Sequence, residues 1–201
     1  LDAETLHEAL RTARKGSAAD LCGTRPEHLK VLLDSGEHWD TFCSLADAFA
    51  QADLPPRVRD VIAKGRMTAL KKDNGQARGI VVGCTFRRLV CRAIAKQLAA
   101  TFAAATAPYQ FALQTRAGAD ALVHALRALT DADPDRVVLS LDGIGAFDHI
   151  LRAEMLQALL RDRELADLHS LVPLVRAFYA GESCYYWTDD EGNTHEIRQL
   201  E

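Results

Sequence analysis

The residues best suited to chemistry lie in the stretch VVLSLDGIGAFD, from Val137 to Asp148. Positions 137–141 are mostly β-branched or apolar, a composition typical of a buried strand, and this predicted strand ends at Asp142. A carboxylate at the end of a buried strand is held rigidly where a hard divalent cation can reach it. We therefore expect Asp142 to bind Mg²⁺, with the backbone carbonyl of Gly143 beside it. An Asp-Gly turn without a metal is the alternative for this tripeptide alone.

Two other kinds of aspartate site do not fit this stretch. A phosphatase of the haloacid dehalogenase type needs a second Asp two residues after the first, and Ile144 stands at that position. An EF-hand calcium loop needs alternating oxygen ligands, which the residues after Asp142 do not supply.

A strongly basic segment runs from Arg57 to Lys96. It holds eleven Lys and Arg residues against two Asp residues, whereas the rest of the chain holds 13 basic and 26 acidic residues. The net charge of −4 hides this separation. A block of this kind favours an anion-binding surface, with nucleic acid or nucleotide phosphates as the ligands. For Arg87, Arg88 and Arg92 taken alone, a solvated helix face is the alternative.

Within this basic segment the sequence predicts a β-hairpin. Residues 67–70 and 80–82 flank an Asn74-Gly75 pair, which is the strongest short hairpin turn signal. Three cations lie beside the turn: Lys71, Lys72 and Arg78. The point charge of a lysine and the planar fork of an arginine can bind the phosphates of one ligand. Charges that serve only solubility are the alternative.

The 137–148 stretch resembles motif A of reverse transcriptases, especially those of the non-LTR retrotransposon type. The matching residues are Asp142, Ala146, Phe147 and Asp148. In that family the strand-end Asp binds both catalytic metals, and an aromatic residue excludes the ribose 2′-hydroxyl of the incoming nucleotide. The resemblance assigns these roles to Asp142 and Phe147. A place in the core is the alternative for Phe147, and capping of the next helix is the alternative for Asp148.

The resemblance covers the chain from about Lys15 to Arg198. Further family-like blocks are, in order, Lys15-Gly16-Ser17 with Asp20 and Gly23, His28-Leu29, Leu54-Pro55, Ala69 to Arg78, Arg87-Arg88-Leu89, Tyr109-Gln110-Phe111 and 118–129. The family's fingers hairpin holds the triphosphate of the incoming dNTP, which assigns substrate binding to Lys71, Lys72 and Arg78. The sequence departs from the family at Gly79, where Pro is usual, and at Ala112, where Gly is common.

The resemblance implies an RNA-directed DNA polymerase that uses two Mg²⁺ ions, dNTPs, an RNA template and a DNA primer. The family's remaining catalytic aspartates would follow Glu201, and one Asp cannot position two ions. We therefore expect residues 1–201 to be one truncated domain, fingers-like over about 1–135 and early palm over 136–201, that does not polymerise as it stands. The Asp189-Asp190 pair is interpreted as a hairpin turn, since Glu191-Gly192-Asn193 follows it.

Periodicity along the chain predicts an α+β fold, rich in helices and with short antiparallel hairpins. Helices are expected near 6–13, 24–33, 42–49, 85–105, 118–130, 152–161 and 165–179, and a second hairpin joins 183–187 to 195–200. Thr24 is expected to cap the second of these helices and Thr85 the fourth.

Composition limits the remaining possibilities. The chain has 201 residues, of which 48% are hydrophobic and 26% charged, which excludes wholesale disorder. No apolar run approaches the roughly 20 residues of a membrane span. The five scattered cysteines do not have zinc-site spacing. They predict reduced, mostly buried thiols in an intracellular protein, which would be nuclear if it comes from a eukaryotic retroelement.

Two other functions remain open at this point. One is a non-catalytic RNA-binding module that uses the basic segment. The other is a helical interaction scaffold for an acidic protein partner.

Overall fold

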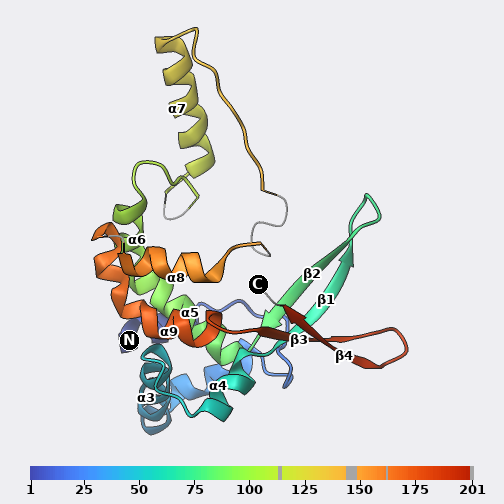
Figure 1. Cartoon of the computed structure of the whole chain (residues 1–201). Helices are drawn as coiled ribbons and strands as arrows, with labels where there is room; N and C mark the ends of the chain where they lie inside the picture. The colour runs from blue at the N-terminus through green and yellow to red at the C-terminus, as the bar shows by residue number, and fades with distance from the viewer. Residues whose placement is uncertain (113–114, 144–148, 162, 200–201) are drawn as a thin grey trace.

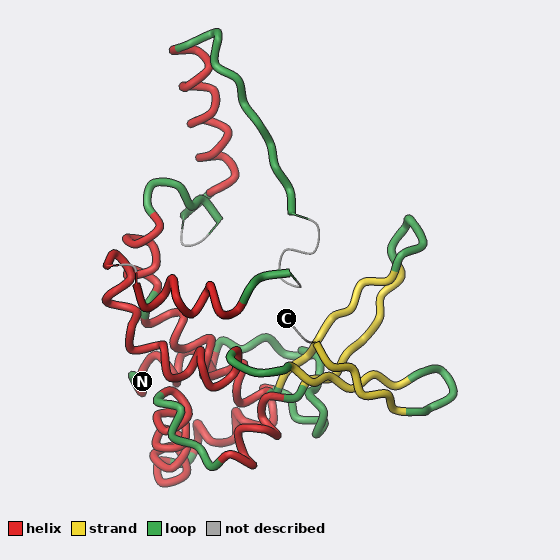
Figure 2. Tube along the Cα trace, viewed as in Figure 1, coloured by secondary structure: helices red, strands yellow, loops and turns green. Residues whose placement is uncertain are grey.

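The computed structural model describes residues 1–112, 115–143, 149–161 and 163–199, and its architecture is α+β, as predicted. Most of the helices pack together in one part of the molecule, the helix at 118–132 stands apart from them, and a small sheet projects on another side (Figures 1 and 2). No described helix has both the length and the apolar composition that a membrane crossing requires.

Most of the predicted helices are present. The described helices are α1 (Ala3–Arg11), α2 (Pro26–Leu29), α3 (Gly36–Ala50), α4 (Pro56–Ala63), α5 (Thr85–Gln97), α6 (Ala99–Thr106), α7 (Gly118–Ala132), α8 (Arg152–Arg161) and α9 (Val172–Tyr179), with 3₁₀ segments at Lys30–Asp34 and Arg163–Leu171. The single helix expected over 85–105 is divided at Leu98 into α5 and α6. Helix α4 was not predicted, and it begins at Pro56 because the first helical turn does not need the N–H that proline lacks.

Neither predicted threonine cap is correct. Arg25 holds the N-cap position of α2, and its backbone N–H donates to His28 Nδ1 at 3.4 Å. Cys84 holds the N-cap position of α5, so that Thr85 is already helical. Thr85 Oγ1 instead donates to the carbonyl oxygen of Thr24 at 2.8 Å. The two threonines therefore join a loop to a helix that lies far from it in the sequence.

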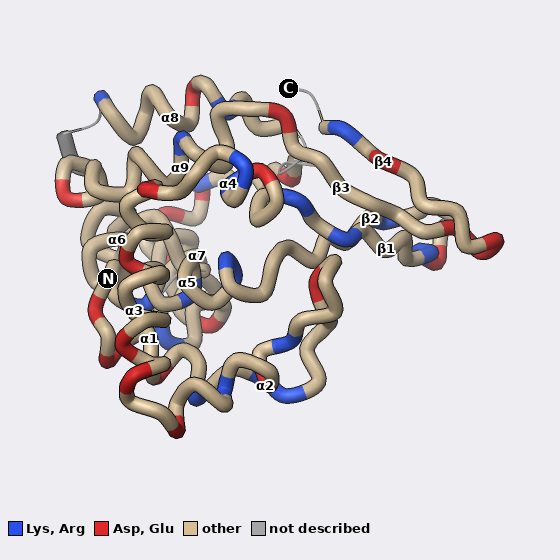
Figure 3. Tube along the Cα trace, turned by 90° about the horizontal axis from the view of Figure 1, so that it is seen from below, with Lys and Arg blue, Asp and Glu red and all other residues tan. Residues whose placement is uncertain are grey.

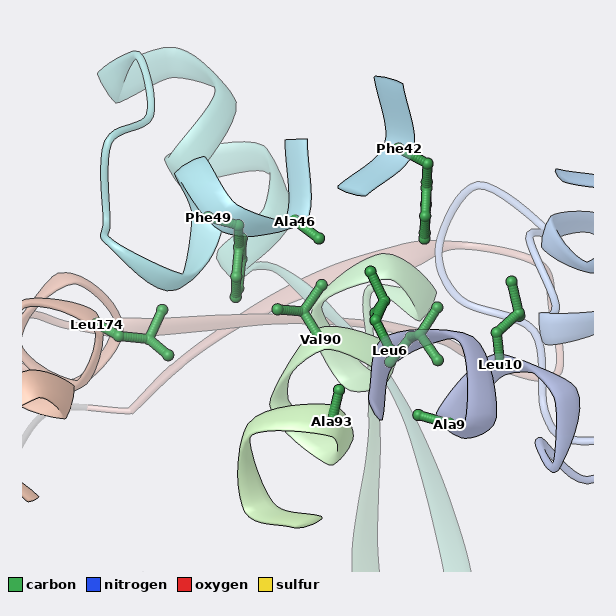
Figure 4. Packing of buried hydrophobic residues seen from close by; sticks show 10 residues of the cluster. Leu6, Ala9, Leu10, Phe42, Ala46, Phe49, Val90, Ala93 and Leu174 are labelled. Carbon is green, nitrogen blue, oxygen red and sulfur yellow. The ribbon is translucent and has the colours of Figure 1, made fainter. Parts of the chain in front are cut away.

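The hydrophobic core lies where α1, α3, α5 and α9 meet (Figure 4). Its buried members are Leu6, Ala9 and Leu10 of α1, Phe42, Ala46 and Phe49 of α3, Leu89, Val90 and Ala93 of α5, and Leu174 of α9. The ring of Phe86 makes edge contacts with Phe42 and with Phe49, each with 5.5 Å between ring centroids. Helical spacing puts the buried side chains of α1 on one face and those of α3 on another, although Leu45, expected on the same face of α3, is 54% exposed.

Two hairpins form one four-stranded sheet. The strands are β1 (Gly65–Lys71), β2 (Ala77–Gly83), β3 (Ser183–Thr188) and β4 (Thr194–Gln199), in the spatial order β2-β1-β3-β4. Both hairpins were predicted. They join through a parallel pairing of β1 with β3, in which Gly65 lies opposite Tyr185 and Met67 opposite Trp187. This pairing links segments on the two sides of the boundary expected near residue 135.

The strand predicted over 137–141 does not form. Residues 137–143 have no regular secondary structure, and Leu139 and Leu141 are 77% and 84% exposed. Within the described chain, the sheet contains only β1 to β4, so no strand accepts or donates hydrogen bonds along this segment. Apolar composition alone does not make a strand, because the backbone N–H and C=O groups need a partner.

The cysteines are unpaired but are less buried than expected. All five have free thiols, with Cys22 and Cys91 exposed and the other three partly buried. Although part of the Cys91 residue is exposed, partial desolvation of its thiol raises the pKa of that thiol.

Candidate functional site

The β1–β2 hairpin has the turn that the sequence predicted. The backbone N–H of Lys72 donates to Gln76 O at 2.7 Å, and that of Gly75 donates to Lys72 O at 2.9 Å. Asn74 Oδ1 accepts from the backbone N–H of Gln76 at 3.1 Å. Gly75 has a φ of 82°, a left-handed conformation that glycine adopts without strain. The Asn-Gly pair therefore closes the turn by a local mechanism.

The three cations of this hairpin are exposed near its tip. Within the described chain, Lys71, Lys72 and Arg78 form no ion pair with any carboxylate. Strand register separates them, because Lys71 lies opposite Ala77 whereas Arg78 lies opposite Leu70. Side chains alternate between the faces of a strand, so the register places Arg78 on the face opposite to Lys71, whereas Lys72 follows the last residue of β1 and belongs to the turn. The register therefore argues against Lys71 as the partner of Arg78 and leaves Lys72 as the candidate.

Other cations of the basic segment are used to hold the fold together. Lys and Arg positions follow the β1–β2 hairpin in Figure 3 and continue into α5. Three arginines of α5 donate to backbone carbonyls of other segments: Arg87 to Ala63, Arg88 to Ala18 and Arg92 to Thr12. The guanidinium of Arg87 also lies 5.5 Å from the centroid of the Phe178 ring. These arginines are therefore not simply a solvated helix face.

A polar contact that the sequence did not predict joins Lys64, at the end of α4, to the β3–β4 hairpin. Lys64 Nζ donates to the hydroxyl of Tyr186 at 3.2 Å and lies 5.4 Å from the ring centroid. The hydrogen bond to Tyr186 raises the pKa of Lys64. The Tyr186 hydroxyl donates in turn to Glu196 Oε2 at 3.1 Å. Lys64 and Tyr186 are 122 residues apart, so no local sequence signal could have paired them.

Asp142 lies in the exposed segment 137–143. The prediction that it ends a buried strand is therefore wrong. Among the described residues, Asp142 forms no ion pair with Lys71, Lys72 or Arg78. Phe147, expected to discriminate against ribonucleotides, lies outside the described residues, as do Ala146 and Asp148. Gly143 follows Asp142 in the same exposed segment.

The expected magnesium centre is not formed by the described residues alone. They contain no group of three or more His, Cys, Asp or Glu side chains placed to hold a metal ion. One carboxylate and one backbone carbonyl are too few ligands to hold two ions in place. Asp142 and Gly143 can therefore supply only part of such a centre.

Asp20, part of the first family-like block, has a structural role. It is 6% exposed, and its Oδ1 accepts from the backbone N–H groups of Cys22 at 3.0 Å and Thr24 at 2.9 Å. Its Oδ2 accepts from the backbone N–H of Thr85 at 2.8 Å. Burial raises the pKa of Asp20, but these hydrogen bonds outweigh burial and leave the pKa below its ordinary value. The carboxylate holds the loop after α1 against the start of α5.

Asp189 lies in the turn between β3 and β4, as predicted. Its Oδ1 accepts from the backbone N–H groups of Glu191 at 3.1 Å and Asn193 at 2.8 Å. Its Oδ2 lies 2.7 Å from His195 Nε2. The hydrogen bond with His195 is the main reason that the pKa of Asp189 falls to about 2. This carboxylate is committed to the turn.

Comparison with known proteins adds no constraint on these assignments, since the chain matches no protein-family model and no curated protein sequence.

Proposed function

We propose that the chain is the fingers and early palm of a reverse transcriptase of the non-LTR retrotransposon type. The complete polymerase would copy an RNA template from a DNA primer, using dNTPs and Mg²⁺. The β1–β2 hairpin carries this proposal. It occurs where the ordered motifs require the family's fingers hairpin, and its exposed cations have no carboxylate partner among the described residues.

The hairpin supports a specific assignment of the triphosphate ligands. Lys71 and Arg78 lie on opposite faces of the hairpin, whereas Lys72 follows β1 in the turn. A lysine point charge and an arginine fork at one end of a hairpin can bind neighbouring phosphates of the same triphosphate. We assign the triphosphate to Lys72 and Arg78, and we assign Lys71 to the opposite surface of the hairpin.

The segment that holds Asp142 supports the second part of the proposal. Val137, Leu139 and Leu141 are 87%, 77% and 84% exposed. Burying such a side chain contributes about 1.5–3 kcal/mol, so this segment would gain stability by pairing with further strands. In the proposed polymerase those strands belong to the rest of the palm, and Asp142 would then end a buried strand. Asp142 is one metal ligand in this proposal, and no catalytic step is assigned to residues 1–201 alone.

Calorimetric titration of the 201-residue chain with a dNTP tests the hairpin assignment. The double variant Lys72→Gln and Arg78→Gln should bind about tenfold more weakly, because it loses charge-assisted hydrogen bonds worth about 1.4 kcal/mol or more. Arg127→Gln in α7 is the control, since it removes a cation from an exposed helix face outside the hairpin. Equal affinity for the hairpin variant and the control would refute the assignment.

Primer extension tests whether the complete protein is a polymerase. The 201-residue chain should bind a primed RNA template without extending it. The longest natural chain that contains these residues should extend the primer, and Asp142→Ala should abolish extension. Synthesis by the 201-residue chain that depends on Asp142 would show that the other ligands lie within these residues. Template binding without extension by any form would favour a non-catalytic RNA-binding module.

A further inference from the structure

We propose that a cavity between the end of α1, α2 and α5 binds one phosphate group of an RNA strand. The cavity has a volume of about 180 Å³. Its polar lining consists of Arg14, Ser17, Thr85, Arg88 and Arg92. The inference that the phosphate belongs to RNA rests on the proposed function, whereas the presence of an anion site rests on the cavity itself.

Charge in the cavity is one-sided. Three of its lining residues are arginines, and none of them forms an ion pair with a carboxylate of the described chain. The nearby acids Asp20 and Glu27 are not part of the lining. Asp20 accepts from the backbone N–H of Thr85, and Glu27 Oε1 accepts from that of Gly16, while Glu27 Oε2 is buried with no partner among the described residues. Three cations around one small space repel one another unless an anion joins them.

The hydrogen-bond donors that remain available belong to the arginines. Ser17 Oγ already donates to Arg14 O at 2.7 Å, and Thr85 Oγ1 donates to the Thr24 carbonyl. Arg88 Nε is buried and has no hydrogen-bond partner among the described residues. The guanidinium of Arg14 likewise has no partner in the described chain. A ligand in this cavity must therefore accept hydrogen bonds from guanidinium groups, as phosphate oxygens do.

The size of the cavity selects one phosphate group over a whole nucleotide. Pockets for drug-sized ligands measure about 300–1,000 Å³. At about 180 Å³, this cavity is too small for a base, a sugar and a phosphate together. Arg14 and Arg92 are exposed, while Arg88 is partly buried. A strand can therefore pass over the two outer arginines and insert a single phosphate toward the inner one.

The salt dependence of RNA binding tests this geometry. The probe is a fluorescent single-stranded RNA of twelve uridines, and its binding is followed by anisotropy in increasing NaCl. Arg14→Gln and Arg92→Gln should each weaken binding about fivefold at low salt. Each should reduce the slope of log K against log salt by about 0.7, the value for one single-strand phosphate. Arg88 is left unchanged because its Nη2 donates to both Ala18 O and Thr85 Oγ1. Arg92→Gln also removes the contact of Arg92 with Thr12, so Arg14→Gln, which breaks no such contact, is the cleaner of the two variants.

The double variant distinguishes one shared phosphate from two independent contacts. If Arg14 and Arg92 hold the same phosphate, the double variant should lower the slope by about 0.7 and not by about 1.4. Arg127→Gln is the matched control and should change neither affinity nor slope. Thermal unfolding of each variant verifies that it is folded. Slopes equal to that of the unsubstituted chain in both single variants, or a doubled loss in the double variant, would overturn the proposal.

Two competitors identify the source of the phosphate. Polyglutamate that displaces the RNA as efficiently as unlabelled RNA would assign the cavity to a protein carboxylate and overturn the proposal. If inorganic phosphate stabilises the unsubstituted chain but not Arg14→Gln, and the chain does not bind RNA, the cavity is an anion site and the proposed function is refuted. If Arg14→Gln and Arg92→Gln leave RNA binding unchanged while dNTP still binds at Lys72 and Arg78, the phosphate site in the cavity is refuted and the proposed function is kept.

Discussion

The carboxylate of Asp20 accepts a hydrogen bond from the backbone N–H of Thr85 at 2.8 Å, across 65 residues of sequence. Asp20 also accepts from Cys22 and Thr24, so one buried side chain both shapes its own loop and fastens that loop to α5. Thr85 accepts in turn from Arg88 Nη2 at 3.0 Å, and both residues line the cavity. Asp20 therefore positions Thr85, and through Thr85 it positions Arg88 at the cavity.

Replacing Asp20 with Asn should destabilise the protein by about 2 kcal/mol. The amide keeps the size of the side chain but replaces one acceptor oxygen with an NH₂ donor that would face backbone N–H groups. Urea unfolding of Asp20→Asn against the unsubstituted chain measures the loss. Asp53→Asn, an exposed change of the same chemistry, should cost less than about 0.5 kcal/mol. Equal stability of the two variants would show that the Asp20 hydrogen bonds contribute little.

Acid should open the β3–β4 hairpin between about pH 4 and pH 2. The pKa of Asp189 is about 2 in the folded chain against an ordinary value of 3.8. A carboxylate whose pKa is lowered by folding stabilises the fold at any pH above its ordinary pKa. This stabilisation is lost as the pH falls through the pKa of the folded state. Trp187 reports on the hairpin because its ring stacks on His195 with 5.2 Å between centroids.

The fluorescence of Trp187 should therefore change across this pH range, in a Trp39→Phe background that leaves it as the single tryptophan. The pKa of Asp20 is also lowered, which makes a local probe necessary. Asp189→Asn should remove the transition seen by Trp187. Its persistence in that variant would assign it to another group.

Two glycines of the β1–β2 hairpin should respond differently to alanine. Gly75→Ala should destabilise the hairpin by about 1 kcal/mol, because its φ of 82° strains any residue with a Cβ. The three atoms nearest to a Cβ at Gly79 all belong to the side chain of Met67, and the nearest is its Cε, the end of a flexible side chain that can move. Gly79→Ala should therefore cost little. Amide hydrogen exchange of β1 and β2 measures both effects, and faster exchange in Gly79→Ala than in Gly75→Ala would contradict this account.

Local patterns were enough to predict much of the fold. The Asn74-Gly75 turn encodes the first hairpin within a few residues, and the spacing of Leu6, Ala9 and Leu10 encodes the buried face of α1. The turn at Asp189 was equally local. Each of these features depends on residues that are neighbours in sequence, so the sequence contains the whole signal.

The apolar segment at 137–141 shows where such patterns fail. Its composition is that of a buried strand, yet Leu141 is 84% exposed in the structure. Propensity describes how well a residue fits a sheet, and it does not supply the neighbouring strand. The support expected for Asp142 was missing for that reason.

The order of amino acids by itself determined the helices of the core, the two hairpins and the concentration of positive charge between Arg57 and Lys96, since each follows from neighbouring residues. Only the tertiary structure decided that β1 pairs with β3, that Asp20 reaches Thr85, and that three arginines surround one cavity. These contacts join segments that are distant in sequence, and their formation depends on which surfaces the packed helices bring together in space.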